Sequence, residues 1–172
     1  MLLHKESRTL RINGDIGVIS DTHGQVRPEA LSALADCELI LHVGDIGKPE
    51  VMDALTEQAQ VVAIRGNVDH GDWALAYPET QELTVNGLRI QMVHRHQDIP
   101  SLLPETPCDV VLFGHSHKPF SETKEGVLYF NPGSAGPRRF SLPVTVGRLR
   151  ITDSGVEGHI QELDVPGPRR RK

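Results

Sequence analysis

The chain has 172 residues and a mass of 19.0 kDa, which is the length of a single domain. Its 18 basic and 23 acidic side chains leave a net charge of −5, and this balance argues against a nucleic-acid partner, because binding to the phosphate backbone needs a basic face. No apolar run reaches the roughly 18 residues of a membrane span, so we expect no membrane partner. Cys37 and Cys108 are too few for a disulfide framework, and we expect them to be buried thiols of a cytoplasmic protein.

Short apolar strands alternate with helices in the first half of the chain. Both predicted helices begin at a proline, whose fixed backbone suits the first helical turn. This alternation is typical of βαβ units that build a parallel sheet. The predicted strands are residues 15–20, 38–43 and 60–65, and the predicted helices are residues 28–36 and 49–58.

Strands joined by tight turns predominate in the second half. Asn86-Gly87 is a strong hairpin signal between the apolar runs that flank it. The predicted strands are residues 81–86, 88–93 and 109–113, followed by a hairpin at 119–130 and another at 142–151 and 156–165. We therefore predict an α/β fold in which two mixed β-sheets pack as a sandwich flanked by helices.

This organisation predicts one domain with a short segment at either end. We expect an N-terminal extension at residues 1–14 and the folded domain at residues 15–165. Residues 166–172 contain proline, glycine and four basic side chains, which is the composition of a solvated chain end. We expect them to form a flexible basic tail.

Polar side chains follow five of the predicted strands, at the point where each strand ends. In chain order these segments are Asp21-Thr22-His23, Gly44-Asp45, Gly66-Asn67-Val68-Asp69, His94-Arg95-His96 and Gly114-His115-Ser116-His117. A single Asp or Asn after a strand is usually a turn former or a helix cap. Ligands of α/β sheets bind at the carboxyl ends of the strands, so five such segments favour one shared functional site.

Converging Asp, Asn and His side chains indicate a metal centre. No cysteine joins the group, which argues against a structural zinc site. The candidate ligands are Asp21, His23, Asp45, Asn67, His94, His115 and His117. A single catalytic ion normally takes three protein ligands, whereas seven donors that include a shared carboxylate suit two ions about 3.5–4 Å apart.

This ordered set of motifs resembles the calcineurin-like metallophosphoesterase superfamily, and within it the small YfcE-like phosphodiesterase branch. The motifs Asp-x-His, Gly-Asp, Gly-Asn, His and Gly-His-x-His occur in that order, and a turn of the branch follows at Asn131-Pro132-Gly133-Ser134. The resemblance implies a β-sandwich flanked by helices. It also implies that one ion binds Asp21, His23, Asp45 and His117, and that the other binds Asp45, Asn67, His94 and His115.

The same resemblance implies a phosphodiesterase that depends on two divalent metal ions. Its substrate would be a small or nucleotide-like phosphoester, attacked by a hydroxide that bridges the two ions. Manganese is the first expectation for the metal, with nickel, zinc or iron as alternatives, because such ligands select loosely among these ions.

The chain departs from the wider family at two positions. Larger phosphatases carry a histidine, as proton donor, where this chain has Val68, and the branch carries glycine where this chain has Arg95. Arg95 either points to solvent or adds a positive charge beside the substrate. His96 is our candidate for the proton donor, with substrate orientation as the equal alternative. Asn67 and Asp69 are the other catalytic candidates. We expect the Asp69 carboxylate to hold a ligand histidine in its tautomer.

Two other functions stay in view. The metal ligands alone do not separate a phosphodiesterase from a phosphomonoesterase or a nucleotide pyrophosphohydrolase. The fold also serves as a non-catalytic interaction scaffold in the retromer subunit that resembles this branch. Because all seven ligand positions hold competent donors, we expect an enzyme. The predicted hairpins would permit a homodimer.

Overall fold

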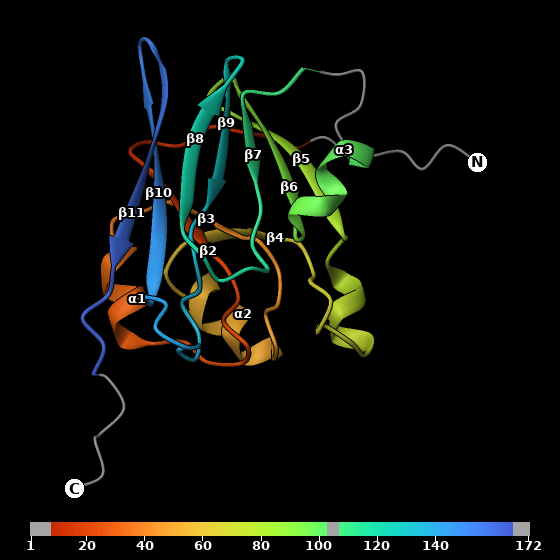
Figure 1. Ribbon diagram of the computed structural model, residues 1–172, viewed down its shortest axis with the longest axis vertical. Coiled ribbons are helices and arrows are strands. Elements are labelled where there is room, and N and C mark those ends of the chain that lie inside the picture. The colour runs from red at the N-terminus through yellow and green to blue at the C-terminus, as the bar shows by residue number, and fades with distance from the viewer. Residues whose placement is uncertain (1–7, 103–106, 167–172) are drawn as a thin grey trace, which may run out of the picture.

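Two β-sheets packed face to face form the centre of the computed structural model, which describes residues 8–102 and 107–166 (Figure 1). One sheet has six strands, in the order β1 (Arg8–Leu10), β5 (Thr80–Val85), β6 (Leu88–Val93), β7 (Val110–Leu112), β9 (Val127–Asn131) and β8 (Phe120–Lys124). The other has five strands, in the order β11 (Gly155–Glu162), β10 (Thr145–Thr152), β2 (Ile16–Ile19), β3 (Leu39–His42) and β4 (Gln60–Ala63). Each sheet contains parallel and antiparallel pairs, so the predicted fold class is confirmed.

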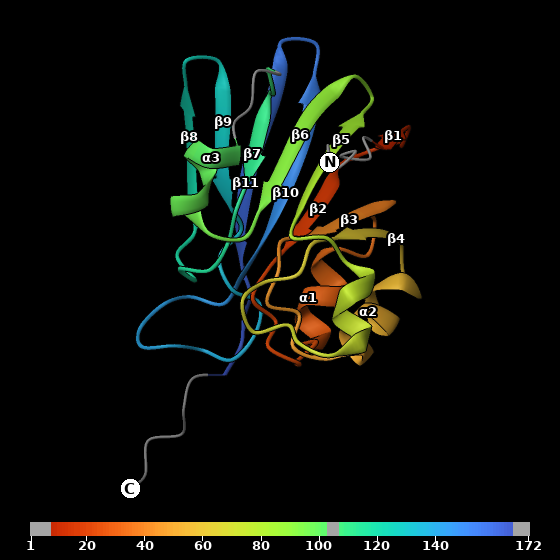
Figure 2. The same cartoon turned by 90° about the vertical axis from the view of Figure 1, so that its right-hand side faces the viewer.

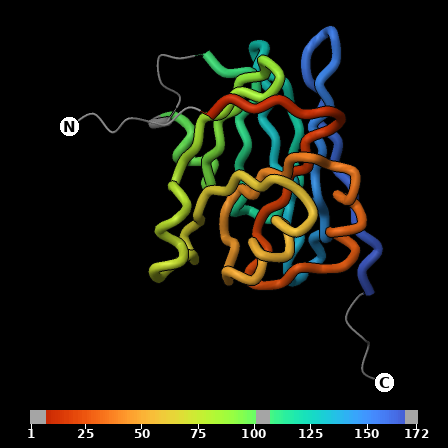
Figure 3. The backbone as a smooth tube through the Cα atoms, turned by 180° about the vertical axis from the view of Figure 1, so that it is seen from behind, coloured from red at the N-terminus to blue at the C-terminus, as the bar shows by residue number. Residues whose placement is uncertain are grey.

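Two helical crossovers make the centre of the five-stranded sheet parallel. Helix α1 (Pro28–Ala33) connects β2 to β3, and α2 (Pro49–Thr56) connects β3 to β4. Figure 3 shows these crossovers in orange and yellow on the near face of the molecule. Figure 2 shows that α1 and α2 lie on one side of the molecule and that α3 (Ile99–Leu102) lies on the other. Two short 3-10 turns, η1 (Asp72–Ala76) and η2 (His96–Asp98), complete the described elements.

Alternation along each strand divides the apolar side chains between the two faces of the five-stranded sheet. In β3, Leu39 and Leu41 point into the core between the sheets, where they join Ile90 and Leu112 of the other sheet. Ile40, between them, points to the opposite face and packs in the cluster that α1 and α2 cover. Every residue of β2 and β3 is therefore buried, as is usual for a parallel sheet that is covered on both faces.

The predicted elements are confirmed with ends displaced by a few residues, whereas strand β1, helix α3 and the two 3-10 turns were not predicted. Strand β1 lies within the predicted N-terminal extension and pairs in parallel with β5. Ile12 lies just after β1, and the Asn86 side chain accepts a hydrogen bond from its backbone nitrogen and donates one to its backbone oxygen. A three-residue strand has too little alternation to be predicted. The predicted tail lies, apart from Pro166, outside the described residues.

The sequence also predicted two buried thiols and no membrane span. Cys37 is buried and Cys108 is half-buried, both are free, and burial raises the pKa of each thiol. Among the helices of residues 8–102 and 107–166, none has the length and hydropathy that a membrane span requires.

Candidate metal centre

The candidate ligands lie at one end of the sandwich because five parallel strands finish there. Strands β2, β3 and β4 are parallel neighbours in one sheet, and β6 and β7 are parallel neighbours in the other. The loops that follow neighbouring strands are joined by backbone hydrogen bonds. Asp21 N donates to Gly44 O at 3.0 Å, and Gly114 N donates to His94 O at 2.9 Å. His115 N also donates to Asp21 Oδ2 at 3.1 Å, so loops of both sheets meet at this edge.

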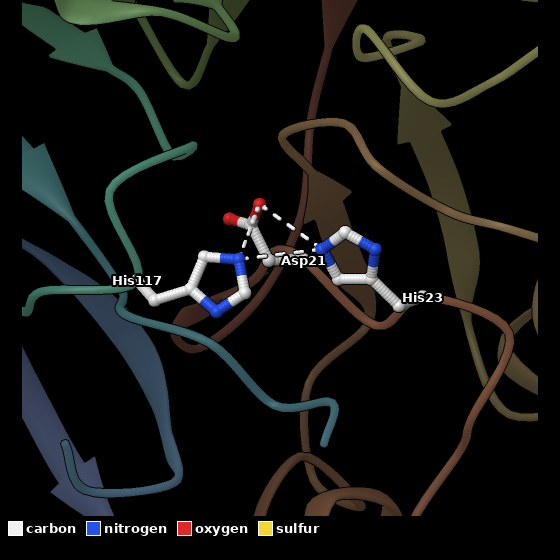
Figure 4. A group of neighbouring side chains, drawn as sticks. All are labelled: Asp21, His23 and His117. Atoms are coloured by element: carbon white, nitrogen blue, oxygen red, sulfur yellow. Dashed lines mark hydrogen bonds and ion pairs between the residues drawn. The ribbon is translucent and has the colours of Figure 1, made fainter. Parts of the chain in front are cut away.

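Six of the seven candidate ligands form two groups of three. Asp21, His23 and His117 make the first group (Figure 4), and Asp45, His94 and His115 make the second. Within each group the donor atoms lie within 4.8 Å of one another. In the first group Asp21 Oδ1 lies 3.4 Å from His117 Nε2 and 3.8 Å from His23 Nε2. Each group draws ligands from both sheets.

Asp45 lies between the two groups. Its Oδ2 is 3.6 Å from His23 Nε2, in the first group, and 3.3 Å from His94 Nε2, in the second. Asn67, the seventh candidate, lies beside the second group, with its Oδ1 at 3.0 Å from His115 Nδ1. The structure therefore brings all seven predicted ligands together and gives Asp45 the central position.

The chemistry of these donors fits divalent cations. Asp21 Oδ2 accepts hydrogen bonds from Ser20 Oγ and from His115 N, whereas Asp21 Oδ1 is buried with no hydrogen-bond partner among the described residues. His94 Nδ1 donates to Val43 O at 2.8 Å, which leaves Nε2 as the nitrogen with the lone pair. This Nε2 is also buried and has no hydrogen-bond partner among the described residues. Buried lone pairs without partners are costly, and a cation would satisfy both atoms.

Burial and charge shift the pKa values of the histidines in this cluster. Burial would lower the pKa of His94, but the Asp45 and Asp21 carboxylates outweigh it and raise the pKa above the usual value. Burial dominates at His23 and lowers its pKa. For Asp45, burial would raise the pKa, but the neighbouring His94 and His23 rings and the Val68 N–H outweigh it and lower the pKa. A metal ion at His94 would displace any proton held there, so metal affinity depends on pH.

The backbone at the ligands is strained. Five of the seven have positive φ, a region that non-glycine residues seldom occupy. The values are 56° at Asp21, 47° at His23, 55° at Asp45, 72° at His115 and 62° at His117. Such strain costs of order 1–3 kcal/mol for each residue and tends to gather at functional sites.

Gly66 leaves the space that the Asp45 carboxylate occupies. A Cβ at Gly66 would overlap both the Oδ1 and the backbone nitrogen of Asp45. We expect Gly66→Ala to move Asp45 and to weaken Mn²⁺ binding about 10- to 100-fold, as is typical when the support of a metal ligand is disturbed. Isothermal titration calorimetry measures this change. The control is Gly87→Ala, at a turn with open space around it, which should lower stability by about 1 kcal/mol but leave Mn²⁺ affinity intact; equal affinities in the two variants would contradict the expectation.

His96, the candidate proton donor, lies beside a cavity that none of the seven ligands lines. The His96 ring packs against Phe113 at a centroid distance of 5.3 Å and lines a cavity of about 490 Å³ with Phe120 and Tyr129. None of the seven ligands lines that cavity. The structure therefore places His96 beside a different cavity from the ligands.

Asp69 has different partners from the predicted ones. Its Oδ2 accepts hydrogen bonds from Ile46 N and Gly66 N, and its Oδ1 accepts one from Gly47 N at 2.8 Å. We predicted a histidine partner, but these bonds all come from backbone N–H groups. Asp69 thus holds the loop of Asp45 against the loop of Asn67.

His42 is a site residue that the motifs did not reveal. It is fully buried at the end of β3, and burial lowers its pKa to about 4. Its Nδ1 accepts a hydrogen bond from Gly44 N at 3.2 Å, and its Nε2 lies 3.0 Å from Thr22 Oγ1, which itself donates to Ile46 O. Neutral His42 therefore connects the loop of Asp21 and His23 to the loop of Asp45. A histidine within an otherwise apolar strand was the signal available in the sequence.

The predicted turn after β9 also supports the ligand loops. Asn131 Nδ2 donates to Gly114 O at 3.2 Å, and Ser134 Oγ donates to Asp21 O at 3.0 Å. Both side chains therefore bind backbone next to, or at, a candidate ligand.

Comparison with known proteins gives consistent matches. A family model described as a calcineurin-like phosphoesterase superfamily domain matches residues 15–154. A probable metallophosphoesterase of Methanothermobacter thermautotrophicus is 33% identical over 163 residues, which are 88% of this chain and 94% of that protein. Phosphodiesterase YfcE of Escherichia coli is 30% identical over 154 residues, 76% of this chain and 84% of YfcE. The crystal structure of Chaetomium thermophilum Vps29 is similar in fold, with a TM-score of 0.67 at 19% identity over 87% of this chain and 98% of that one.

Proposed function

The chain belongs to the calcineurin-like phosphoesterase superfamily, and from this premise we propose that it is a phosphodiesterase that uses two divalent metal ions. The observation that carries the proposal is the pair of donor groups with Asp45 between them. We propose that Asp21, His23, Asp45 and His117 hold one ion and that Asp45, Asn67, His94 and His115 hold the other. Manganese is the proposed metal, with nickel, zinc or iron as alternatives.

Two such ions lower the pKa of coordinated water and polarise the oxygens of a phosphoryl group. Their four positive charges would exceed the two negative charges of Asp21 and Asp45, so the site would attract an anionic ester even though the whole chain is acidic. The substrate proposed for this site is a small or nucleotide-like phosphodiester.

The residues of the chain position the reactants. Burial holds three of the ligands in place, namely Asp21, Asp45 and His94. His115 is exposed and contacts the Asn67 side chain, so a substrate has access to it. Val68 offers no proton for the leaving group, so esters with good leaving groups should react fastest. The proposal that His96 donates this proton applies to leaving groups that extend toward the cavity it lines.

The test is a comparison of two nitrophenyl esters on metal-free protein. Bis(p-nitrophenyl) phosphate and p-nitrophenyl phosphate are assayed side by side, with Mn²⁺, Ni²⁺, Zn²⁺ or no metal. We expect turnover of the diester that requires metal and exceeds turnover of the monoester. Faster turnover of the monoester would select the phosphomonoesterase alternative instead. Turnover without metal would contradict the metal-dependent mechanism.

The likeness in fold to Vps29 supports a second candidate, a non-catalytic interaction scaffold. This candidate predicts that the protein binds metal but hydrolyses neither ester. The retained set of donors favours the enzyme, because a scaffold has no need of lone pairs aimed into a buried site. The homodimer and the cytoplasmic location stay predictions.

A further inference from the structure

A second cavity opens beside the metal centre. It has a volume of about 370 Å³, and the metal-ligand candidates Asn67 and His94 line it together with four charged residues. Arg65 follows β4 and Glu79 precedes β5. Arg95 precedes η2, and Asp98 is the last residue of η2. A group attached to a phosphoester at the centre would therefore extend into this cavity.

The four charged side chains on the cavity wall form two ion pairs, each of one arginine and one carboxylate. Arg95 forms a two-pronged contact with Asp98, from Nε to Oδ2 at 2.8 Å and from its terminal nitrogen to Oδ1 at 3.2 Å. Arg65 lies 3.3 Å from Glu79 and is anchored by a hydrogen bond to the Tyr77 carbonyl. Two guanidinium groups and two carboxylates make the wall neutral as a whole, with abundant donors and abundant acceptors.

This balance distinguishes between kinds of occupant. An anionic group would meet two carboxylates, and a cationic group would meet two guanidinium groups, so either would suffer repulsion as well as attraction. Hydroxyl groups both donate and accept hydrogen bonds, so a group with several hydroxyls matches both halves of each pair. Among the described residues, the bonds of Arg95 to Asp98 use two of its five N–H donors, so that other N–H groups can bind such a substituent.

We propose that this cavity binds a neutral, polyhydroxylated substituent of the phosphodiester, such as a vicinal diol. Two hydroxyls on adjacent carbons can bridge the two members of a pair, because each pair places a further guanidinium N–H beside a carboxylate oxygen. The inference rests on the proposed function and narrows its substrate class. Arg95, at the position where the branch has glycine, becomes a specificity-determining residue.

The test uses p-nitrophenyl diesters that differ only in a three-carbon substituent. The substituents are 2,3-dihydroxypropyl, propyl, 2-carboxyethyl and 3-ammoniopropyl, and kcat/KM for hydrolysis is measured with Mn²⁺. The product followed is the alkyl phosphate, by phosphorus NMR, because the 2-hydroxyl of the diol can also expel nitrophenolate by closing a cyclic phosphate. We expect the diol to exceed propyl by roughly 10- to 100-fold, the effect of hydrogen bonds to charged groups. The anionic and cationic esters should fall below the diol. A preference for the anionic ester, or equal values for all four, would overturn the inference while leaving the phosphodiesterase intact.

A matched pair of variants locates the preference. Arg95→Gln removes one guanidinium from the cavity and should reduce the diol-to-propyl ratio to below about threefold. Arg89→Gln is the control, because Arg89 forms a similar two-pronged pair with Asp109 at the opposite end of β6. Its ratio should match the wild type; an equal fall in both variants would contradict the assignment.

Failure of every ester to react with any metal would instead count against the proposed function. In that case the cavity is tested by binding, in an NMR titration of the wild-type protein with glycerol phosphate and with propyl phosphate. Tighter binding of glycerol phosphate, with shifts at the Arg95 side chain, would support the inference. Equal binding of the two phosphates would overturn it.

Discussion

Replacing Asp45 by Asn should lower metal-dependent turnover of bis(p-nitrophenyl) phosphate by about 1000-fold or more. Asp45 Oδ2 faces a histidine of each donor group, so the lost negative charge affects both proposed ions. Several kcal/mol of charge stabilisation correspond to three or more powers of ten in rate. An amide has nearly the shape of the carboxylate and keeps an oxygen for the hydrogen bond from Val68 N, so the fold should survive.

Metal content separates this effect from general damage. Wild-type protein loaded with Mn²⁺ and freed of excess should retain two ions per chain by elemental analysis, and the Asp45→Asn protein should retain fewer than one. Asp153→Asn, in the turn between β10 and β11, is the control and should behave as the wild type does. Turnover within tenfold of the wild type in the Asp45→Asn protein would show that Asp45 does not have the shared role.

The metal-free protein should lose about 3 kcal/mol of stability through His42 as the pH falls from 6.5 to 4. An unfolded histidine titrates near 6.5, whereas burial lowers the pKa of His42 in the fold to about 4. The unfolded chain therefore binds more protons in this range, so acid favours unfolding. The contribution is complete above pH 6.5 and declines as the pH falls toward 4.

Urea unfolding in EDTA, at intervals between pH 4 and pH 7.5, measures this dependence. In His42→Asn, which keeps an acceptor for Gly44 N, the decline in unfolding free energy should be smaller by about 3 kcal/mol, even if the variant is less stable at neutral pH. His159→Asn, which replaces an exposed histidine, should keep the wild-type decline. An NMR titration of the His42 ring is the second measurement, and a pKa near 6.5 would contradict the expectation.

Local signals were enough to predict most of the fold. Asn86 and Gly87 have φ values of 49° and 83°, the positive values that a two-residue hairpin turn requires, and that requirement made the pair informative. Strand β1 escaped prediction because its place depends on Asn86, which is 74 residues from Ile12. Short strands held by distant partners have no periodicity of their own.

The ligands of the site were easier to predict than their supports. Each ligand follows an apolar strand, and strand ends can be recognised in a sequence. The sequence could not show that two different sheets bring their carboxyl ends to the same edge, nor that Asp69 would bind backbone N–H groups. Arg95 and Asp98 are only three residues apart, but only the folded chain brings their pair and the Arg65–Glu79 pair to the wall of one cavity.

Because each donor group draws ligands from both sheets, the geometry of the site depends on the relative position of the two sheets. His117 follows a strand of one sheet, while Asp21 and His23 follow a strand of the other, and apolar side chains fill the layer between. A small sliding of one sheet over the other would separate the donors of both groups at once, without breaking any strand pair. We therefore expect core residues that bind no ion themselves, such as Met92 and Leu112, to influence metal affinity, so that substitutions there reduce activity before they abolish the fold.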